Sequence, residues 1–436
     1  MARKKPAAGL RPQAADAAAP EVTLDRLLGA LPEQADLAPL REALLRASAA
    51  DASRAWARSS TYATFDKRVV SADALQVVVT SAAQAAHTRL DALYAALAEV
   101  LNFAARGDDV AAAARLIAIG EAAEAEDSMQ TAQAYYEVAA RFSETLADRR
   151  VRVLALRRLA RAHMALGGID EATIYYKASF EQAVVSADIE GQIVACIGLG
   201  NVLLHQGRWD EAAAQYQLGL RLCSDGFARM RGQIAINLAT VQRERGDLAD
   251  AAAQLGAATA LWAELQPADQ SVWYNNRGLL ALARDEVDSA EAIFRQALET
   301  AGSDFDRAMV LDNLAELYLR QGRLADAETF ARSAEEIALR AGSPRALADI
   351  YTRLGKIFRL RADLNGVTFF EKALEICRER RYPLTEANAY LEYGFFRRTL
   401  GDNDEARSYL ERARQLCASI GARQLERAAM EQLAQL

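Results

Sequence analysis

Lysine, histidine, cysteine and proline are all scarce in this chain of 436 residues. With three histidines and four cysteines, no His or Cys pair stands at a metal-ligand spacing. Eight prolines leave room for long, uninterrupted helices. No apolar run reaches transmembrane length, and Met1–Pro20 carries basic residues without the apolar segment of a signal peptide. The sequence therefore predicts a cytoplasmic protein without a metal or cofactor.

The chain also lacks a net positive charge. The net charge is -7, so no strong field attracts nucleic acid or an anionic membrane. Only six of the 52 basic residues are lysines, an arginine bias that is typical of GC-rich genomes and favours a bacterial origin. Walker, Gly-x-Ser-x-Gly and other glycine-rich catalytic motifs are absent from the sequence. We therefore expect no catalytic residues and a function other than that of an enzyme.

Small residues, by contrast, recur at regular intervals. One such position reads Ala139, Ser179, Gly219, Ala258, Ala297, Ala334, Ala373 and Ala413, at intervals of 40, 40, 39, 39, 37, 39 and 40 residues. A repeat of this length indicates a solenoid, in which each helix pair buries its apolar face on its neighbours. The sequence therefore predicts an elongated all-helical fold with one long concave surface.

Two further small positions fix the register of each repeat. The first helix carries Gly120, Ala160, Gly200, Ala239, Gly278, Ala315, Gly355 and Gly394, and the second carries Ala132, Ala172, Ala212, Ala251, Ala290, Ala327, Gly366 and Ala406. Two antiparallel helices approach closely only where neither has a bulky side chain at the crossing. Four residues after the second position stands a large apolar side chain in every copy except the sixth, which has Ala331.

These positions resemble the tetratricopeptide repeat. The third copy follows the family pattern almost throughout, from Cys196-x-x-Leu199-Gly200 to Gly207-x-Trp209-x-x-Ala212-x-x-x-Tyr216. The period is longer than the usual 34 residues or so, and in this it is similar to the extended repeats of peptide-binding bacterial regulators and kinesin-light-chain-like adaptors. The resemblance implies a right-handed α-solenoid of about eight helix pairs that binds a protein or peptide.

Four regions follow from this register. Residues 1–20 lack periodicity and are predicted to be a disordered tail. Residues 21–112 are helical without the repeat signature, and form either an N-terminal bundle or a degenerate repeat. The eight repeats span residues 113–419, and residues 420–436 supply a helix that caps the last repeat.

Asparagine recurs on the helices that line the concave face in this family. Asn237, Asn276 and Asn313 stand two positions before the small residue of their first helices, and Asn201 stands one position after. A side-chain amide offers both a donor and an acceptor, so a row of asparagines can bind the backbone of an extended peptide. The alternative is that these asparagines bridge adjacent helices.

Charged residues flank the asparagines in the predicted groove. Arg157, Arg161, Lys356 and Arg359 fall on inward positions by the same count and favour a ligand with acidic groups. Glu316 also falls inward, so the groove is mixed in charge.

The sequence thus predicts a non-enzymatic scaffold or regulator that binds a peptide or an extended protein segment. Two alternatives stay open. One is a nucleic-acid-linked transcriptional regulator that uses the arginines between residues 149 and 161, although the acidic net charge makes direct nucleic-acid contact a poor fit. The other is a purely structural subunit of a larger complex.

Overall fold

The structure, a computed structural model, describes residues 99–100, 103, 106–125 and 129–436. The chain divides into two compact units, Met1–Arg115 and Leu116–Leu436, and most of the described residues belong to the second. The predicted tail over residues 1–20 lies outside the described residues, as does most of the predicted bundle over residues 21–112.

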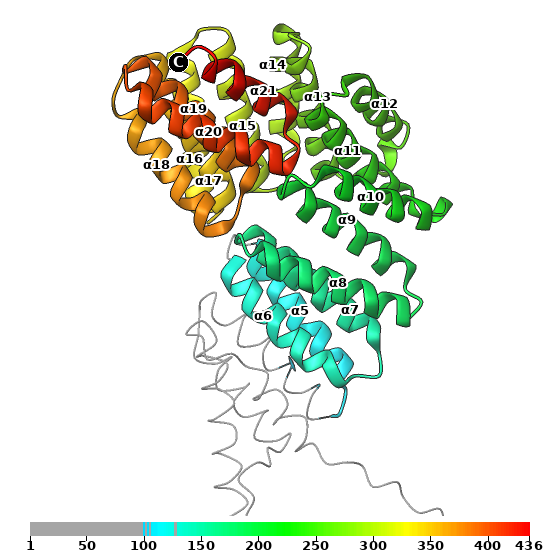
Figure 1. Cartoon of the computed structure of the whole chain (residues 1–436). Helices are drawn as coiled ribbons and strands as arrows, with labels where there is room; N and C mark the ends of the chain where they lie inside the picture. Colours follow the sequence, from blue (N-terminus) through cyan, green and yellow to red (C-terminus); the bar gives the residue numbers. More distant parts are fainter. Residues whose placement is uncertain (1–98, 101–102, 104–105, 126–128) are drawn as a thin grey trace, which may run out of the picture. The chain divides into compact units, whose positions relative to one another are not determined.

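Helices and turns make up the described part of the chain, which contains no strand. Eight helix pairs, here numbered as repeats 1 to 8, follow one another, and a single helix ends the chain (Figure 1). This arrangement confirms the predicted all-α solenoid. The pairs are α5 (Asp109–Ala125) and α6 (Met129–Phe142), α7 (Arg149–Ala165) and α8 (Ile169–Val185), α9 (Ile189–His205) and α10 (Trp209–Leu222), α11 (Ala228–Arg245) and α12 (Leu248–Thr259), α13 (Pro267–Ala283) and α14 (Val287–Thr300), α15 (Asp304–Arg320) and α16 (Leu324–Arg340), α17 (Pro344–Leu360) and α18 (Gly366–Arg380), and α19 (Pro383–Thr399) and α20 (Asn403–Ile420), followed by α21 (Arg423–Leu433).

The small residue of each first helix makes room for the large side chain of the second. A Cβ atom added at Gly120 would lie 2.5 Å from the ring of Tyr136, closer than real Cβ contacts allow. In repeat 6, alanine occupies both places, as Ala315 and Ala331, and both residues are fully buried. The exception at Ala331 therefore keeps the close approach of the two helices with a different pair of side chains.

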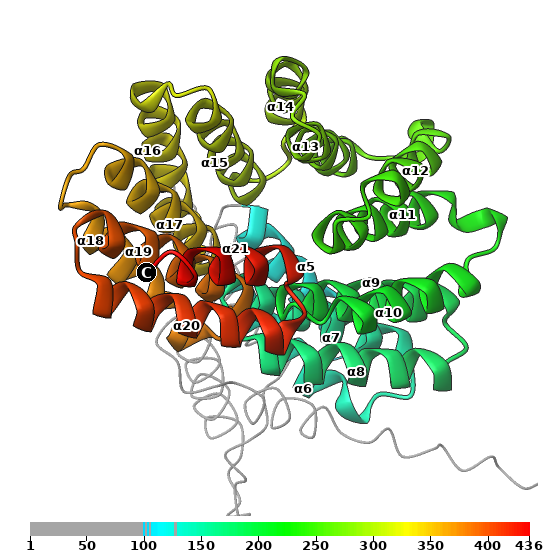
Figure 2. The same ribbon diagram turned by 45° about the horizontal axis from the view of Figure 1, so that its top comes forward.

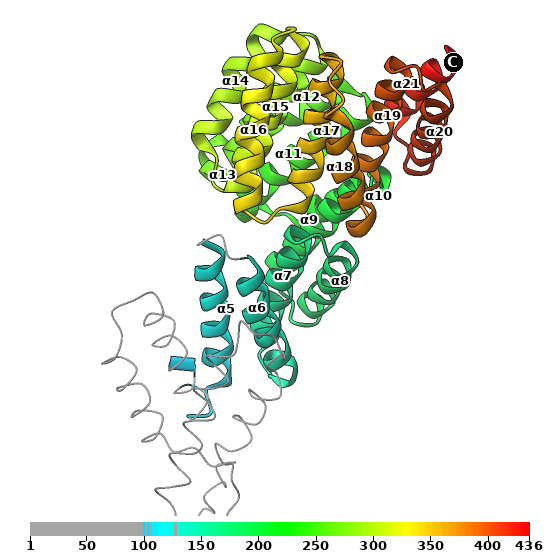
Figure 3. The same cartoon turned by 90° about the vertical axis from the view of Figure 1, so that its left-hand side faces the viewer.

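The second unit closes on itself after about one turn of the solenoid. Figures 2 and 3 show α9 and α10 beside α19 and α20, although these elements are far apart in the sequence. One buried cluster joins Trp209 and Ala213 to Ala387 and Cys417. We call this junction between repeats 2–4 and repeats 7–8 with α21 the seam. The repeat pattern alone predicts no such closure, because it describes only contacts between neighbours.

The last helix both caps the solenoid and joins the seam. Leu425 and Leu433 of α21 pack on the core of the final repeats, as a capping helix requires. Ala422, just before α21, is buried in the cluster that also holds Trp209. Among the helices of the described residues, none has the length and apolar content that a membrane span requires.

Candidate functional site

The inner surface of the second unit borders a channel with a volume of about 720 Å³ that is partly open to solvent. The first helices of repeats 3 to 8 supply most of its lining, and Met164 of α7, Trp209 of α10, and Gln424 and Leu425 of α21 complete it. In repeats 5, 6 and 7 the lining positions include one residue after, and two, three and six residues before, the small residue, and repeats 3, 4 and 8 contribute some of these positions. Positions three, four or seven residues apart lie on one face of a helix.

One side of the channel is an asparagine wall, which we define as Asn201, Asn237, Asn275, Asn276 and Asn313. Asn201 Oδ1 accepts hydrogen bonds from Tyr216 at 2.6 Å and from Asn237 Nδ2 at 3.1 Å. Asn313 Nδ2 donates to Asn275 Oδ1 at 2.8 Å. These bonds link neighbouring repeats, so the asparagines both bridge helices and line the channel.

The five asparagines differ in burial. Asn276 and Asn313 are 7% exposed, whereas Asn201, Asn237 and Asn275 are half-buried. Asn276 Oδ1 accepts a hydrogen bond from the Thr240 hydroxyl at 3.0 Å, and its Nδ2 donates to the Val272 carbonyl at 3.1 Å. A side-chain amide has two donors and an acceptor with two lone pairs, so the bond that Asn237 makes to Asn201 uses only part of its capacity.

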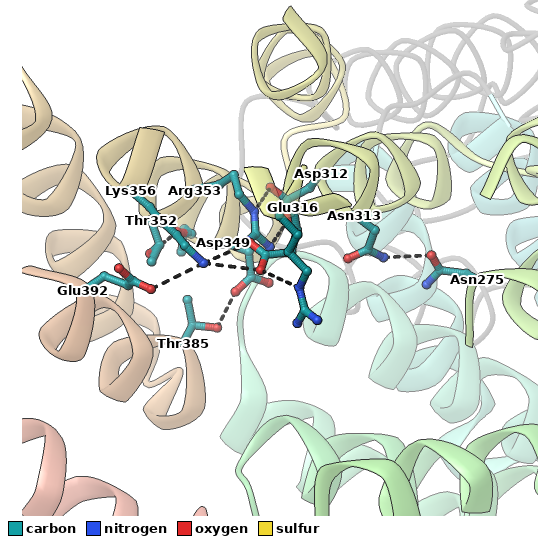
Figure 4. A network of polar contacts seen from close by, with 12 residues as sticks. Asn275, Asp312, Asn313, Glu316, Asp349, Thr352, Arg353, Lys356, Thr385 and Glu392 are labelled. Atoms are coloured by element: carbon teal, nitrogen blue, oxygen red, sulfur yellow. Dashed lines mark hydrogen bonds and ion pairs between the residues drawn. The ribbon is translucent and has the colours of Figure 1, made fainter. Parts of the chain in front are cut away.

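The other side of the channel is a charged wall on α15, α17 and α19, which we define as Asp312, Glu316, Asp349, Arg353, Lys356 and Glu392 (Figure 4). Arg353 Nη2 lies 3.1 Å from Asp312 Oδ2, and Arg353 also contacts Glu316. Lys356 Nζ lies 3.1 Å from Glu316 Oε2 and 3.6 Å from Glu392 Oε1. Lys356 therefore ties together the first helices of repeats 6, 7 and 8.

The electrostatics of the charged wall favour the ionised forms of Glu316 and Arg353. Burial by itself would raise the pKa of Glu316, but the charges of Arg353 and Lys356, with the hydrogen bond from Lys356, lower it to about 2. Burial likewise opposes the charge of Arg353, yet Asp312 and Glu316 raise its pKa. The cations of this wall are thus compensated by carboxylates of the protein itself.

Asp349 lies in the same wall but in a different environment. Burial raises its pKa, although Arg345 Nε at 3.8 Å and a 2.8 Å hydrogen bond from the Thr385 hydroxyl act in the opposite direction. Asp349 and Thr385 again link the first helices of adjacent repeats. The charged wall is therefore bonded across three repeats.

Three of the residues that the sequence places in the groove do not line this channel. Arg359 contacts Glu392 at 3.1 Å behind Lys356. Arg161 lines a second cavity of about 600 Å³, where it pairs with Glu124. Arg157 lines neither cavity, and burial lowers its pKa. The channel brings together the other six predicted residues: Asn201, Asn237, Asn276, Asn313, Glu316 and Lys356.

The arginines between residues 149 and 161 have partners within the protein. Arg158 pairs with Glu121, Arg152 Nη2 lies 3.4 Å from Glu144, and Arg149 Nη1 donates to Gln182 at 2.7 Å. These residues form a solvated surface of alternating charge. Their arrangement lends no support to the nucleic-acid alternative.

Several channel residues escaped the sequence analysis. Asn275 and Thr352 stand three positions before the small residue, and Asp349 and Asn388 stand six before it. These residues could have been predicted by extending the helical period one turn further toward the N-terminus of each first helix. Within the described part of the chain, no three His, Cys, Asp or Glu side chains are grouped so as to hold a metal ion.

Comparisons with known proteins agree with the fold. A sequence model described as tetratricopeptide repeat matches residues 269–340, a second matches residues 193–217 and 232–257, and a third matches residues 387–418. No curated protein matches the chain at a significant level. The helix pairs and their spacing define an α-solenoid. More narrowly, the matched stretches place this solenoid with those of the tetratricopeptide-repeat type.

Solved structures of low sequence identity have a similar arrangement of helices. The Rap conjugation gene regulator of the plasmid pLS20, in complex with the Phr* peptide, has a TM-score of 0.52 and 12% identity, and the match covers 83% of this chain and 96% of the regulator. A Rap protein complexed with competence and sporulation factor has a TM-score of 0.41 and 12% identity, over 92% and 99% of the two chains. BtubC (BKLC) from P. vanneervenii has a TM-score of 0.36 and 20% identity, over 53% and 91%. The likeness to the plasmid regulator supports the fold alone.

Proposed function

We propose that this protein binds a short peptide, or an extended segment of a protein, in the channel and holds it by its backbone. Tetratricopeptide repeats and the α-solenoid fold support a role as a protein-interaction scaffold. The observation that carries the finer proposal is the asparagine wall, because amides on consecutive repeats offer a donor and an acceptor at each step of an extended chain.

The size of the channel favours a short ligand. A volume of about 720 Å³ is within the range of small-ligand sites and is too small for a folded domain. The proposal agrees with the likeness to the plasmid regulator, which was solved in complex with a peptide.

The charged wall bears on which peptides fit. Since carboxylates of the protein already surround Arg353 and Lys356, binding does not require acidic groups on the ligand. This replaces the expectation of an acidic ligand, which rested on Arg157, Arg161, Lys356 and Arg359 facing the groove. A non-catalytic role, a cytoplasmic location and a bacterial origin belong to the same proposal.

The test uses short peptides selected from a random displayed library against the whole wild-type protein. The double variant Asn237→Ala with Asn275→Ala removes half-buried amides from the wall, and we expect it to weaken binding of the selected peptides by about a hundredfold or more. Asn276 and Asn313 are poorer choices because they are buried.

Asn403→Ala is the matched control, since Asn403 is an exposed asparagine at the start of α20 and does not line the channel. We expect it to bind the peptides like the wild type. If no peptide is selected, or if the double variant binds as tightly as the control, the proposal is wrong.

A further inference from the structure

The seam is an interface made by the tips of helix pairs. Gly167, Gly207 and Gly246, which follow the first helices of repeats 2, 3 and 4, all have positive φ angles. A Cβ atom at Gly207 would lie 2.9 Å from Cβ of Ile420, and one at Gly246 would lie 2.8 Å from Nε2 of Gln424. These three glycines are therefore needed both for the turn and for the approach of the opposite end of the solenoid.

Equivalent turns away from the seam lack this second requirement. Gly322 and Gly401 have nothing within 4 Å of an added Cβ atom, and Asp285 and Ala362 adopt the same backbone conformation with side chains present. The close approach at Gly167, Gly207 and Gly246 is thus a specific feature of the seam and not of the repeat.

The polar contacts of the seam are weak. Arg381 Nη1 lies 2.5 Å from Asp170 Oδ2, but both side chains are more than half exposed, so the ion pair is screened by solvent. The Tyr382 hydroxyl is buried against Gly167 without a hydrogen-bond partner in the described part of the chain. A buried hydroxyl that loses its water on closure destabilises the closed form.

No single pair of helices across the seam packs as extensively as the consecutive helices from α6 to α21. In a solenoid, each repeat otherwise contacts only its neighbours, so the closed unit separates first where the fewest contacts hold it. The channel lies inside this closed unit, and the residues around Trp209 and Ala422 belong both to its lining and to the seam.

We infer that the seam between repeats 2–4 and repeats 7–8 with α21 is a gate, which opens to admit the ligand into the channel and closes around it. The inference rests on the proposed function for its ligand, but the opening itself is a property of the empty protein. A ligand that contacts both the asparagine wall and the charged wall stabilises the closed form by its differential affinity.

The first experiment measures the gate without any ligand. Spin labels on Lys177→Cys and Glu379→Cys, in a Cys223→Ser background, report the distance across the seam because both positions are exposed on α8 and α18. We expect two distances. Ile420→Ala should increase the population of the longer distance because it removes the contact at Gly207, and Tyr382→Phe should decrease that population because it removes the unpaired hydroxyl.

The control pair is Lys177→Cys with Gln217→Cys, on α8 and α10 of neighbouring repeats, where we expect one distance in every variant. One unchanged distance across the seam in wild type, Ile420→Ala and Tyr382→Phe would overturn the gate, whether or not a peptide binds.

The second experiment links the gate to loading. A bis-maleimide joins the same two cysteines in the empty protein, and we expect association of a library-selected peptide to slow by about tenfold or more. Peptide loaded before cross-linking should dissociate more slowly than from the uncrosslinked protein. Unchanged association after cross-linking would refute the gate while leaving the proposed function intact.

Discussion

The two walls of the channel are both built from the first helices of successive repeats, α9 to α15 for the asparagine wall and α15 to α19 for the charged wall, but their chemistry differs. The asparagine wall joins its repeats by single neutral hydrogen bonds such as Asn237 to Asn201. The charged wall joins its repeats by ion pairs in which Arg353 and Lys356 each have two carboxylate partners. The comparison suggests that the charged wall contributes mainly to stability and the asparagine wall mainly to binding.

The largest effect is expected from Arg353→Leu. This change leaves Asp312, whose side chain is 3% exposed, and Glu316 without their main counter-charge. Removal of one partner from a buried ion pair costs about 3–5 kcal/mol, which urea unfolding monitored by circular dichroism would measure.

Arg208→Leu is the matched control, because the pair that Arg208 makes with Glu211 is exposed. We expect it to lower the free energy of unfolding by less than about 1 kcal/mol. Equal losses in the two variants would show that the charged wall does not stabilise the fold.

Acid should weaken the charged wall next. The folded pKa of Glu316 is about 2, below its ordinary value of 4.5, so its ionised form stabilises the protein above pH 4.5. This stabilisation, of about 3 kcal/mol, is lost as the pH falls from 4.5 toward 2. Urea unfolding between pH 7 and pH 3 would measure it, and Glu316→Gln should flatten the acid dependence. An equally steep dependence in Glu316→Gln would contradict this assignment.

Substitutions in the asparagine wall should have smaller effects on stability. Asn276→Ala removes the hydrogen bonds to the Thr240 hydroxyl and the Val272 carbonyl at a buried position, and we expect a loss of about 1–2 kcal/mol. Asn237→Ala removes one bond at a half-buried position and should cost less than about 1 kcal/mol. Thermal unfolding of both variants would rank them. A larger loss for Asn237→Ala than for Asn276→Ala would contradict the assignment of Asn276 as the more stabilising of the two asparagines.

The repeat pattern predicted the fold and part of the site for a clear physical reason. Small residues at helix crossings fix the register, and the register fixes which side chains face inward, so Asn237, Asn276, Asn313 and Lys356 could be assigned by counting. Lys356 and Glu316 were expected to face a ligand, but the pattern carries no information on how strongly they pair with each other.

The seam could not be predicted from the sequence. The ion pair between Asp170 and Arg381 joins residues 211 positions apart, and the repeat constrains only neighbours. Small changes in the angle between repeats add up along the chain and decide whether its ends meet. Repeat 2 lies at the edge of the channel and contributes only Met164 to its lining, so Arg157 and Arg161 lie outside it.

The most direct test of backbone recognition is a scan with N-methylated peptides. Each amide of a library-selected peptide is methylated in turn, which removes one donor and leaves the side chains unchanged, and affinity for the wild-type protein is measured by calorimetry. We predict large losses at alternate positions, because every second backbone amide of an extended peptide faces the asparagine wall. Uniform tolerance of N-methylation, with affinity set only by the peptide's side chains, would contradict the account.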